Sequence, residues 1–292
     1  MPLPSFTPPV LLAAGTAGTL DEMAGVIDLS KLGGIVTKSI TKDPRDGNAA
    51  WRVAPVKGGM INAIGLANPG IDAFMADWAP KVASVPTTVI GSAAGFTVEQ
   101  YTAVCRSFET IDAMPAVELN VSCPNTEHGI DFGTDPKLLA ELVAACREAM
   151  PTTGLIVKLP PIAIGTPHTI VDLARAAIDA GAEALTLCNT TPAMAIDIDT
   201  GEPKLGNRHG GLSGPAVHPI VTRLIDLCYR EFCKERGIPI LGLGGVLDWD
   251  DAAEFMLAGA SAVQVGTASF VDPKRAIRIA KRLTKWYSER TT

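Results

Sequence analysis

The sequence predicts a closed (β/α)₈ barrel, an α/β fold in which eight parallel strands alternate with helices. Eight short apolar runs of strand character recur along the 292 residues, and all but one of the gaps between them have room for a single helix. Continuous apolar strands that alternate with helices indicate a parallel sheet covered on both faces. Eight such units in about 260 residues favour closure over an open doubly wound sheet, the main structural alternative.

The expected strands are short and, except in one case, separated by helix-length gaps. In chain order they are Pro9–Gly15, Gly33–Ile40, Thr87–Ala94, Ala116–Ser122, Gly154–Pro160, Ala184–Thr190, Ile238–Gly245 and Ala262–Ala268. Helical periodicity follows in Tyr101–Glu109, Leu138–Ala149, Thr169–Ala180, His218–Lys234, Asp250–Ala258 and Ala276–Trp286. The alternation predicts a single barrel domain over residues 1–292.

Several of these helices begin with a recognisable capping signal. Thr97 is followed three residues later by Gln100, the spacing of a capping box. Asp135-Pro136 and Asp272-Pro273 each place an N-cap aspartate before a proline at the first helical position. These signals predict the first residues of the helices that follow the third, fourth and eighth expected strands.

The second expected strand is followed by a stretch too long for a simple link to a helix. Residues 41–83 contain turn signals in close succession, among them Gly58-Gly59 and Asn68-Pro69-Gly70. We expect an excursion over the barrel mouth that includes a hairpin and ends in a helix at Ile71–Ala83. Long loops within compact domains are usually functional.

Composition narrows the class of protein. The chain is 47% hydrophobic and 19% charged, with a net charge of −6 and a pI near 5.3, which argues against nucleic acid or a membrane as the main partner. We see neither a signal peptide nor an apolar run of the ~20 residues that span a bilayer. The six cysteines form no C-x-x-C pair, and the four histidines give no metal signature. We therefore expect a cytoplasmic enzyme without a metal site.

Polar side chains cluster at the carboxyl ends of the predicted strands, where barrel enzymes carry their chemistry. They are Lys38-Ser39, Ser92, Asn120 with Cys123, Lys158, Asn189-Thr190, Gly244-Gly245 and Gly266-Thr267. Any one of them alone could be a solvated loop residue. Two lysines, a thiol and the amide side chains of Asn120 and Asn189 around one rim indicate a site.

Glycine-rich segments follow the sixth, seventh and eighth strands. Gly244-Gly245 and Gly266-Thr267 occupy the usual phosphate position of this fold, and Gly210 to Gly214 adds a third segment. The alternative is that these glycines only form tight turns. The spacing matches neither G-x-G-x-x-G nor a Walker loop, so a phosphorylated cofactor or substrate is the better interpretation.

Cys123 follows a strand and precedes Pro124, a position that is unusual for a packing residue. It could be an inert core cysteine, a covalent nucleophile or a general base. His128 is nearby in sequence, but nothing fixes it against the sulfur. The other five cysteines have apolar neighbours on predicted helices or strands, and we assign them to packing.

Motifs along the whole chain resemble those of the family-1 dihydroorotate dehydrogenases. They are VTKSIT at 36–41, NAIGL at 62–66, NVSCPN at 120–125, VKLPP at 157–161, LTLCNT at 185–190, GGLSGP at 210–215, GLGG at 242–245 and AGASAVQVGTA at 258–268. HGIDFGTDP and the NAIGL form resemble the B subgroup more closely than the A subgroup. In the B subgroup, the catalytic subunit works with a second, electron-transferring subunit.

The resemblance implies a noncovalent FMN and the oxidation of (S)-dihydroorotate to orotate in pyrimidine synthesis. Cys123 would be the base that removes the C5 proton, while hydride leaves C6 for the flavin. Lys158 would lie at the flavin pyrimidine edge, where a cation stabilises the reduced flavin. The implied substrate-binding residues are Lys38, Asn62, Ala63, Ile64, Gly65, Leu66, Asn120, Asn125, Asn189 and Thr190. The implied cofactor-binding residues are Ala14, Gly15, Lys38, Ser39, Ser92, Asn120, Lys158, Cys188, Gly214, Gly244, Gly245, Gly266 and Thr267.

Two features depart from the B-subgroup pattern. Ser92 stands where many relatives have an asparagine, and the link at 161–167 is longer and more apolar than expected for the B subgroup, while VKLPP itself is closer to the A subgroup. The electron acceptor therefore stays open between fumarate and a partner subunit carrying FAD and a [2Fe–2S] cluster. The resemblance also implies a homodimer core. The alternative functions are reduction of uracil-type bases, a flavin-binding subunit without turnover, and a barrel acting on a sugar phosphate.

Overall fold

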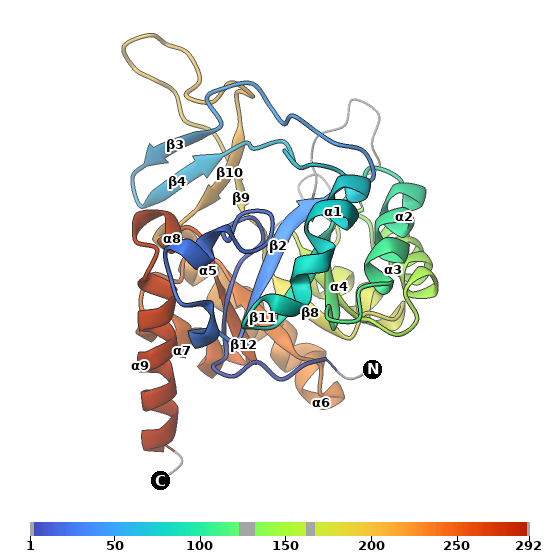
Figure 1. Cartoon of the computed structure of the whole chain (residues 1–292). Coiled ribbons are helices and arrows are strands. Elements are labelled where there is room, and N and C mark those ends of the chain that lie inside the picture. The colour runs from blue at the N-terminus through green and yellow to red at the C-terminus, as the bar shows by residue number, and fades with distance from the viewer. Residues whose placement is uncertain (1–2, 123–131, 162–166, 291–292) are drawn as a thin grey trace.

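Eight parallel strands close into a barrel in the computed structural model, which describes residues 3–122, 132–161 and 167–290 (Figure 1). The barrel order is β1-β12-β11-β8-β7-β6-β5-β2. The strands are β1 (Val10–Leu12), β2 (Gly34–Ile40), β5 (Val89–Ala93), β6 (Ala116–Asn120), β7 (Gly154–Leu159), β8 (Ala184–Leu187), β11 (Ile240–Leu243) and β12 (Ala262–Val265). Each lies within one of the eight expected runs, so the predicted (β/α)₈ barrel is confirmed.

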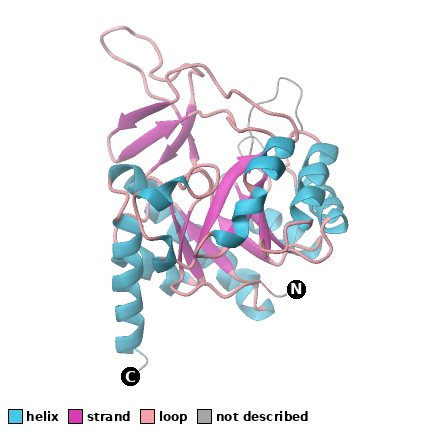
Figure 2. Cartoon of the chain, in the orientation of Figure 1, coloured by secondary structure: helices cyan, strands magenta, loops and turns pink. Residues whose placement is uncertain are grey.

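Helices surround the barrel strands on the outside (Figure 2). They are α1 (Ile71–Asp77), α2 (Val98–Glu109), α3 (Pro136–Ala149), α4 (Ile170–Asp179), α5 (His218–Cys228), α6 (Lys234–Arg236), α7 (Trp249–Ala258), α8 (Ala268–Val271) and α9 (Arg275–Arg290). Among the described residues, no helix is long and apolar enough to cross a membrane. The helix expected at His218–Lys234 is not uniform, because a π-helical turn at Tyr229–Cys233 separates α5 from α6.

The capping signals are partly confirmed. The Thr97 side chain accepts a hydrogen bond from the Gln100 N–H, but the Gln100 side chain accepts from Phe96 rather than closing the box on Thr97. Asp135 caps α3 as expected. Asp272 accepts from the Lys274 N–H. Helix α9 begins at Arg275, two residues after Pro273, which the capping signal placed at the first helical position.

A second, four-stranded sheet lies beyond one end of the barrel, on the side toward which the β2 arrow points (Figure 1). Its order is β3-β4-β10-β9, with β3 (Val53–Val56), β4 (Gly59–Asn62), β9 (Thr191–Ala193) and β10 (Gly210–Ser213). The antiparallel pair β3–β4 is the hairpin expected within 41–83. The sheet joins this hairpin to a segment about 150 residues further along the chain.

The sequence indicated Gly210–Gly214 as a further glycine-rich phosphate segment. In the structure its first four residues form strand β10 instead. A Cβ on Gly211 would lie 1.8 Å from Thr190 Oγ1, and one on Gly210 would lie 2.2 Å from the Asn62 carbonyl oxygen. Close approach of neighbouring strands therefore accounts for both glycines without a ligand.

The barrel interior starts with an apolar layer to which every barrel strand contributes one residue. Its members are Leu11, Val36, Ile90, Ala116, Ile156, Ala184, Leu241 and Ala262. A larger apolar cluster, which includes Phe74 and Phe108, fills the space between strands and helices. Both faces of the parallel sheet are thus covered, as the continuous apolar runs indicated.

A polar layer lies directly above the apolar one. Two residues further along their strands, on the same inner face, come Ser92, Glu118, Lys158, Thr186 and Gln264. All five are buried. Buried polar groups cost free energy unless they are paired, so this layer indicates a role beyond packing.

Replacing a residue of the apolar layer should destabilise the whole barrel. We expect Ile156→Ala to lower the free energy of unfolding by about 2–5 kcal/mol, because it leaves a cavity at a fully buried position. Urea denaturation measures this change. Ile198→Ala, at a side chain that is 92% exposed, is the control and should change stability by less than about 0.5 kcal/mol. Equal effects of the two substitutions would contradict the assigned packing.

Candidate active site

A cavity of about 390 Å³ opens between the carboxyl ends of the barrel strands and the second sheet. Eight of the predicted substrate-binding residues line it: Asn62, Ala63, Ile64, Gly65, Leu66, Asn120, Asn189 and Thr190. They come from three widely separated parts of the sequence, which only the closed barrel and the second sheet bring together. The structure therefore gathers these residues around one space.

A chain of hydrogen bonds crosses the rim of the barrel at the floor of this cavity. Ser92 Oγ lies 2.9 Å from Ser39 Oγ, and Asn120 Nδ2 donates to Ser39 Oγ at 3.2 Å. Asn189 Nδ2 donates to Asn120 Oδ1 at 3.1 Å, and the Asn189 Oδ1 accepts from the Thr190 N–H at 2.8 Å. These contacts connect β2, β5 and β6 with the segment after β8, so the amide side chains have fixed orientations.

The backbone of Asn120 is anchored separately. The buried hydroxyl of Tyr101, on α2, donates to the Asn120 carbonyl oxygen at 2.6 Å. Tyr101 also packs edge-on against Phe132. The end of β6 is thereby held from the helix side, just before the segment that carries Cys123.

The segment from Asn62 to Leu66 is held above the rim by its own set of contacts. Asn62 Nδ2 donates to the Gly211 carbonyl at 3.3 Å, across the β4–β10 pair. Leu66 has a φ of 56°, in the left-handed region that a leucine rarely adopts. Asn68 Nδ2 donates to the Leu66 carbonyl at 2.7 Å, and Arg45 Nε donates to the Gly65 carbonyl at 3.3 Å. Such strain persists only where neighbouring contacts fix the backbone, as here.

Both predicted lysines lie near the barrel interior, in different electrostatic surroundings. Lys158 is buried, with its Nζ 3.8 Å from Glu118 Oε1. It lies two residues before Pro160, which lines the cavity. Burial lowers the pKa of Lys38 from its ordinary value of 10.5, and the charge of Arg52 lowers it further. Lys38 also contacts the predicted site residue Gly15, since a Cβ there would lie 3.4 Å from Lys38 Cδ.

The predicted phosphate-side residues form a second group. A Cβ on Gly245 would lie 2.8 Å from the Gly214 carbonyl oxygen, and Thr267 Oγ1 donates to Ser213 Oγ at 2.7 Å. Gly214, Gly244 and Gly245 all have positive φ, so the backbone alone accounts for glycine at these positions.

Gly266 is different from the other glycines of this group. Its φ is not in the left-handed region, and a Cβ there would be 3.7 Å from the nearest atom, Ala13 Cβ. Neither the backbone nor packing within the described chain requires glycine at this position. Absence of a side chain does leave room for a ligand to approach the backbone closely.

Cys188, which the resemblance placed near the cofactor, is a buried thiol. Burial raises its pKa to about 12, so the thiol stays protonated at neutral pH. Ala14 packs against the apolar layer of the barrel. Cys123 and Asn125, two central residues of the predicted site, lie outside the described residues.

Several charged groups near the site were not singled out from the sequence. Arg45 lines the cavity, and its guanidinium lies 4.7 Å from the ring centre of Phe96. Arg52 lies, like Arg45, within residues 41–83, which the sequence indicated only as an excursion. Glu118 was not predicted as a site residue, because it lies in the middle of β6 and not at a strand end. A charged residue within an apolar strand is the signal that could have found it.

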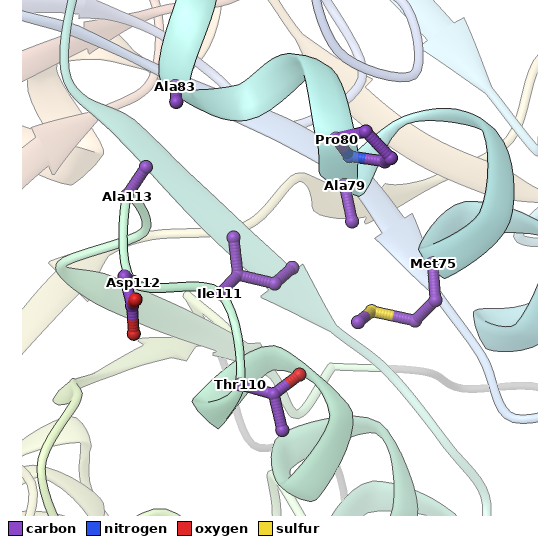
Figure 3. A pocket seen from close by; sticks show the side chains of 8 residues that line it. All are labelled: Met75, Ala79, Pro80, Ala83, Thr110, Ile111, Asp112 and Ala113. Atoms are coloured by element: carbon purple, nitrogen blue, oxygen red, sulfur yellow. The ribbon is translucent and has the colours of Figure 1, made fainter.

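A second hollow, of about 330 Å³, lies away from this site (Figure 3). Met75, Ala79, Pro80 and Ala83 line one side, and Thr110 to Ala113, in the link that leads into β6, line the other. The hollow is therefore at the amino end of the barrel strands. Asp112 is its only charged lining residue among those described. In the described part of the chain, no group of three His, Cys, Asp or Glu residues could hold a metal ion.

The fold and the polar rim place the chain among the barrel enzymes whose chemistry lies at the carboxyl ends of the strands. Comparison with known proteins is more specific. The family model for dihydroorotate dehydrogenase matches residues 2–286. The chain belongs to this family, and its enzymes are oxidoreductases.

The similar curated proteins cover nearly the whole chain. One is the dihydroorotate dehydrogenase B (NAD(+)) catalytic subunit of Trichlorobacter lovleyi, 44% identical over 97% of this chain and 90% of the relative. The protein of the same name from Geobacter sulfurreducens is 45% identical over 96% and 90%. A relative from Solibacter usitatus, provisionally assigned as dihydroorotate dehydrogenase A (fumarate), is 45% identical over 95% and 89%.

The lowered pKa of Lys38 predicts an unusual amine reactivity. Because its pKa lies below the ordinary value, Lys38 should be modified by an amine-selective reagent at a lower pH than an ordinary lysine. Arg52→Gln should move this reactivity profile to higher pH, since it removes the neighbouring positive charge. Mass spectrometry of labelled peptides over a pH series measures both profiles. A profile that does not move in Arg52→Gln would show that this charge does not act on Lys38.

Proposed function

We propose that this chain catalyses the FMN-dependent oxidation of (S)-dihydroorotate to orotate in de novo pyrimidine biosynthesis. The observation that carries the proposal is the meeting of Asn62, Asn120 and Asn189 in one cavity at the barrel mouth. Dihydroorotate has ring N–H and C=O groups next to one another. Amide side chains, which both donate and accept hydrogen bonds, are suited to such an edge. Ala63 to Leu66 and Thr190 are further substrate-binding residues of the proposal.

The residues present fit a bound FMN. A Cβ on Gly266 would meet only Ala13 and Leu243, at ordinary contact distances, so neither packing nor backbone demands glycine there. Gly214, Gly244, Gly245 and Thr267 would hold the phosphate with it. Lys38, with its ammonium near Gly15, and Lys158 supply the positive charge that a reduced flavin favours. Ala14, Ser39, Ser92, Asn120 and Cys188 complete the proposed set of flavin-binding residues.

The chain's own residues then divide the reaction between them. FMN, when bound, would supply the acceptor for the hydride of substrate C6. Cys123 would take the proton from C5, and Asn120, Asn125 and Asn189 would hold the ring so that this C–H faces the thiol. Lys38 would contact both substrate and cofactor, and Lys158 would be a catalytic cation at the flavin. Cys188 does not compete as the base, because burial keeps its thiol protonated.

A flavin-dependent reductase of uracil-type bases is the second candidate, because it would use the same amides. The charges around the cavity favour a substrate with a carboxylate. Arg45 lines the cavity, and Arg52 donates to the carbonyl of Asn48, another lining residue. Uracil has no carboxylate to pair with these cations, whereas orotate does.

The relatives' names guide the proposal for electron transfer. Most of those compared are named as NAD(+)-type catalytic subunits. We therefore propose a cytoplasmic homodimer core of single-domain barrels that passes electrons to a second subunit carrying FAD and a [2Fe–2S] cluster. Purification of the native protein, with identification of what copurifies, distinguishes this arrangement from direct reduction of fumarate.

The central test is anaerobic reduction of the protein-bound flavin. The protein reconstituted with FMN should be yellow and should bleach when dihydroorotate is added without oxygen. Absorbance at the flavin band follows the reaction, and titration with orotate and uracil compares their affinities. We expect tighter binding of orotate, because only orotate has the carboxylate. A protein that stays colourless with FMN would overturn the proposal, and preferred binding of uracil would favour the second candidate.

The proposed base predicts a pH-dependent defect. Cys123→Ser should slow flavin reduction near neutral pH by about 100- to 10,000-fold, because a serine hydroxyl is a much weaker base than a thiolate. The rate should partly recover in alkali. Stopped-flow absorbance measures it, with Cys105→Ala on α2 as the control for loss of a packing cysteine. Unchanged kinetics in Cys123→Ser would remove this thiol from the mechanism.

A further inference from the structure

Glu118 is a fully buried carboxylate in the middle of strand β6, with 0% of its surface exposed. One carboxylate oxygen, Oε2, accepts hydrogen bonds from Thr186 Oγ1 and Gln264 Nε2, both at 2.7 Å. The other oxygen, Oε1, lies 3.8 Å from Lys158 Nζ and has no hydrogen-bond partner in the described part of the chain. The two neutral donors therefore hold one oxygen, and the free oxygen faces the lysine.

Barrel stability does not explain this arrangement. Removing a carboxylate from water costs several kcal/mol, and buried ion pairs are often no more stable than well-packed apolar residues of similar volume. The layer directly below is filled by aliphatic side chains alone. Four strands instead contribute one polar residue each, namely Glu118, Lys158, Thr186 and Gln264, to a single network.

The network is arranged around the position of one ammonium group. Gln264 Nε2 donates to Glu118 and lies 3.3 Å from Thr186 Oγ1, so the three side chains restrain one another. Lys158 is the register partner of Asn120, which belongs to the amide chain on the cavity floor. The Lys158 ammonium group held by Glu118 therefore belongs to the strand next to Asn120, which lines the cavity.

We propose that Glu118 is a positioning residue, which Thr186 and Gln264 orient and which holds the Lys158 ammonium in place beneath the cavity. This inference rests on the proposed flavin function, because a fixed cation there stabilises the negative charge of the reduced cofactor. Glu118 acts only through Lys158. Its effect on the cofactor disappears when the lysine is absent.

Glu118→Gln tests this role, because a glutamine side chain has nearly the same shape as a glutamate side chain. The amide removes the charge that faces Lys158, so the ammonium group moves away from its place beneath the cavity. This movement takes a positive charge away from the cofactor side of the barrel. The flavin midpoint potential should therefore become more negative, because reduced FMN should bind about tenfold less tightly relative to oxidised FMN.

A double-mutant cycle separates positioning from a merely structural role. Lys158→Met should shift the midpoint potential in the same direction, and the double variant Glu118→Gln/Lys158→Met should shift no further than Lys158→Met alone. Dye-equilibration titrations of the FMN-loaded proteins measure the four potentials. Glu183→Gln removes a carboxylate paired with Arg147 at 3.2 Å, outside this network, and should leave the potential unchanged. Additive shifts in the double variant would overturn the proposal, and so would an unshifted Glu118→Gln.

A second measurement does not need the cofactor. In a crystal structure of flavin-free Glu118→Gln, the Lys158 ammonium should be displaced from the place it has 3.8 Å from residue 118 in the unsubstituted chain. An ammonium that stays in place would remove the positioning role. Failure of the unsubstituted protein to bind FMN would instead overturn the proposed function, so the two failures are distinguishable.

Discussion

Each strand of a closed parallel barrel points alternate side chains into the interior, and all eight strands end at the same rim. This constraint decides where the chemistry of the chain lies. The eight aliphatic side chains of the lowest layer close the amino-terminal half of the interior. The buried polar residues of the next layer therefore hydrogen-bond to one another, as Glu118, Thr186 and Gln264 do. Above them the rim presents amides to the cavity.

The barrel was predictable from local patterns because every strand is an apolar run bounded by turn signals. Each of the eight runs became a strand of the closed sheet. The second sheet was predicted only in part, since the hairpin β3–β4 has local turn signals but β9 and β10 do not. Pairing of Gly210–Ser213 with β4 depends on a segment about 150 residues away, which no local pattern in the sequence indicates. The same glycines therefore looked like a loop.

The site was predictable at strand ends and less so elsewhere. Asn120, Asn189 and Thr190 were predicted from strand ends and Asn62 only from the family resemblance, and all four line one cavity. Glu118 and Gln264 were not expected, because their importance depends on which face of the strand they occupy and on partners from other strands. The Gln100 side chain shows the same limit on a smaller scale. Its spacing fits a capping box, but the nearby Phe96 N–H is the donor that it accepts from.

The strand pair β4–β10 has a mechanical consequence. Asn62 ends β4, whereas β9 starts at Thr191, directly after Asn189 and Thr190, and β10 pairs with both strands. One hydrogen-bonded sheet therefore carries the upper wall of the cavity and the side of its rim that follows β8. Asn62 and the residue that follows Thr190 therefore belong to one hydrogen-bonded sheet, whereas Asn120 belongs to the barrel itself. The width of the cavity between Asn62 and Asn120 is thus set by how the second sheet is seated on the barrel, and not by either strand alone.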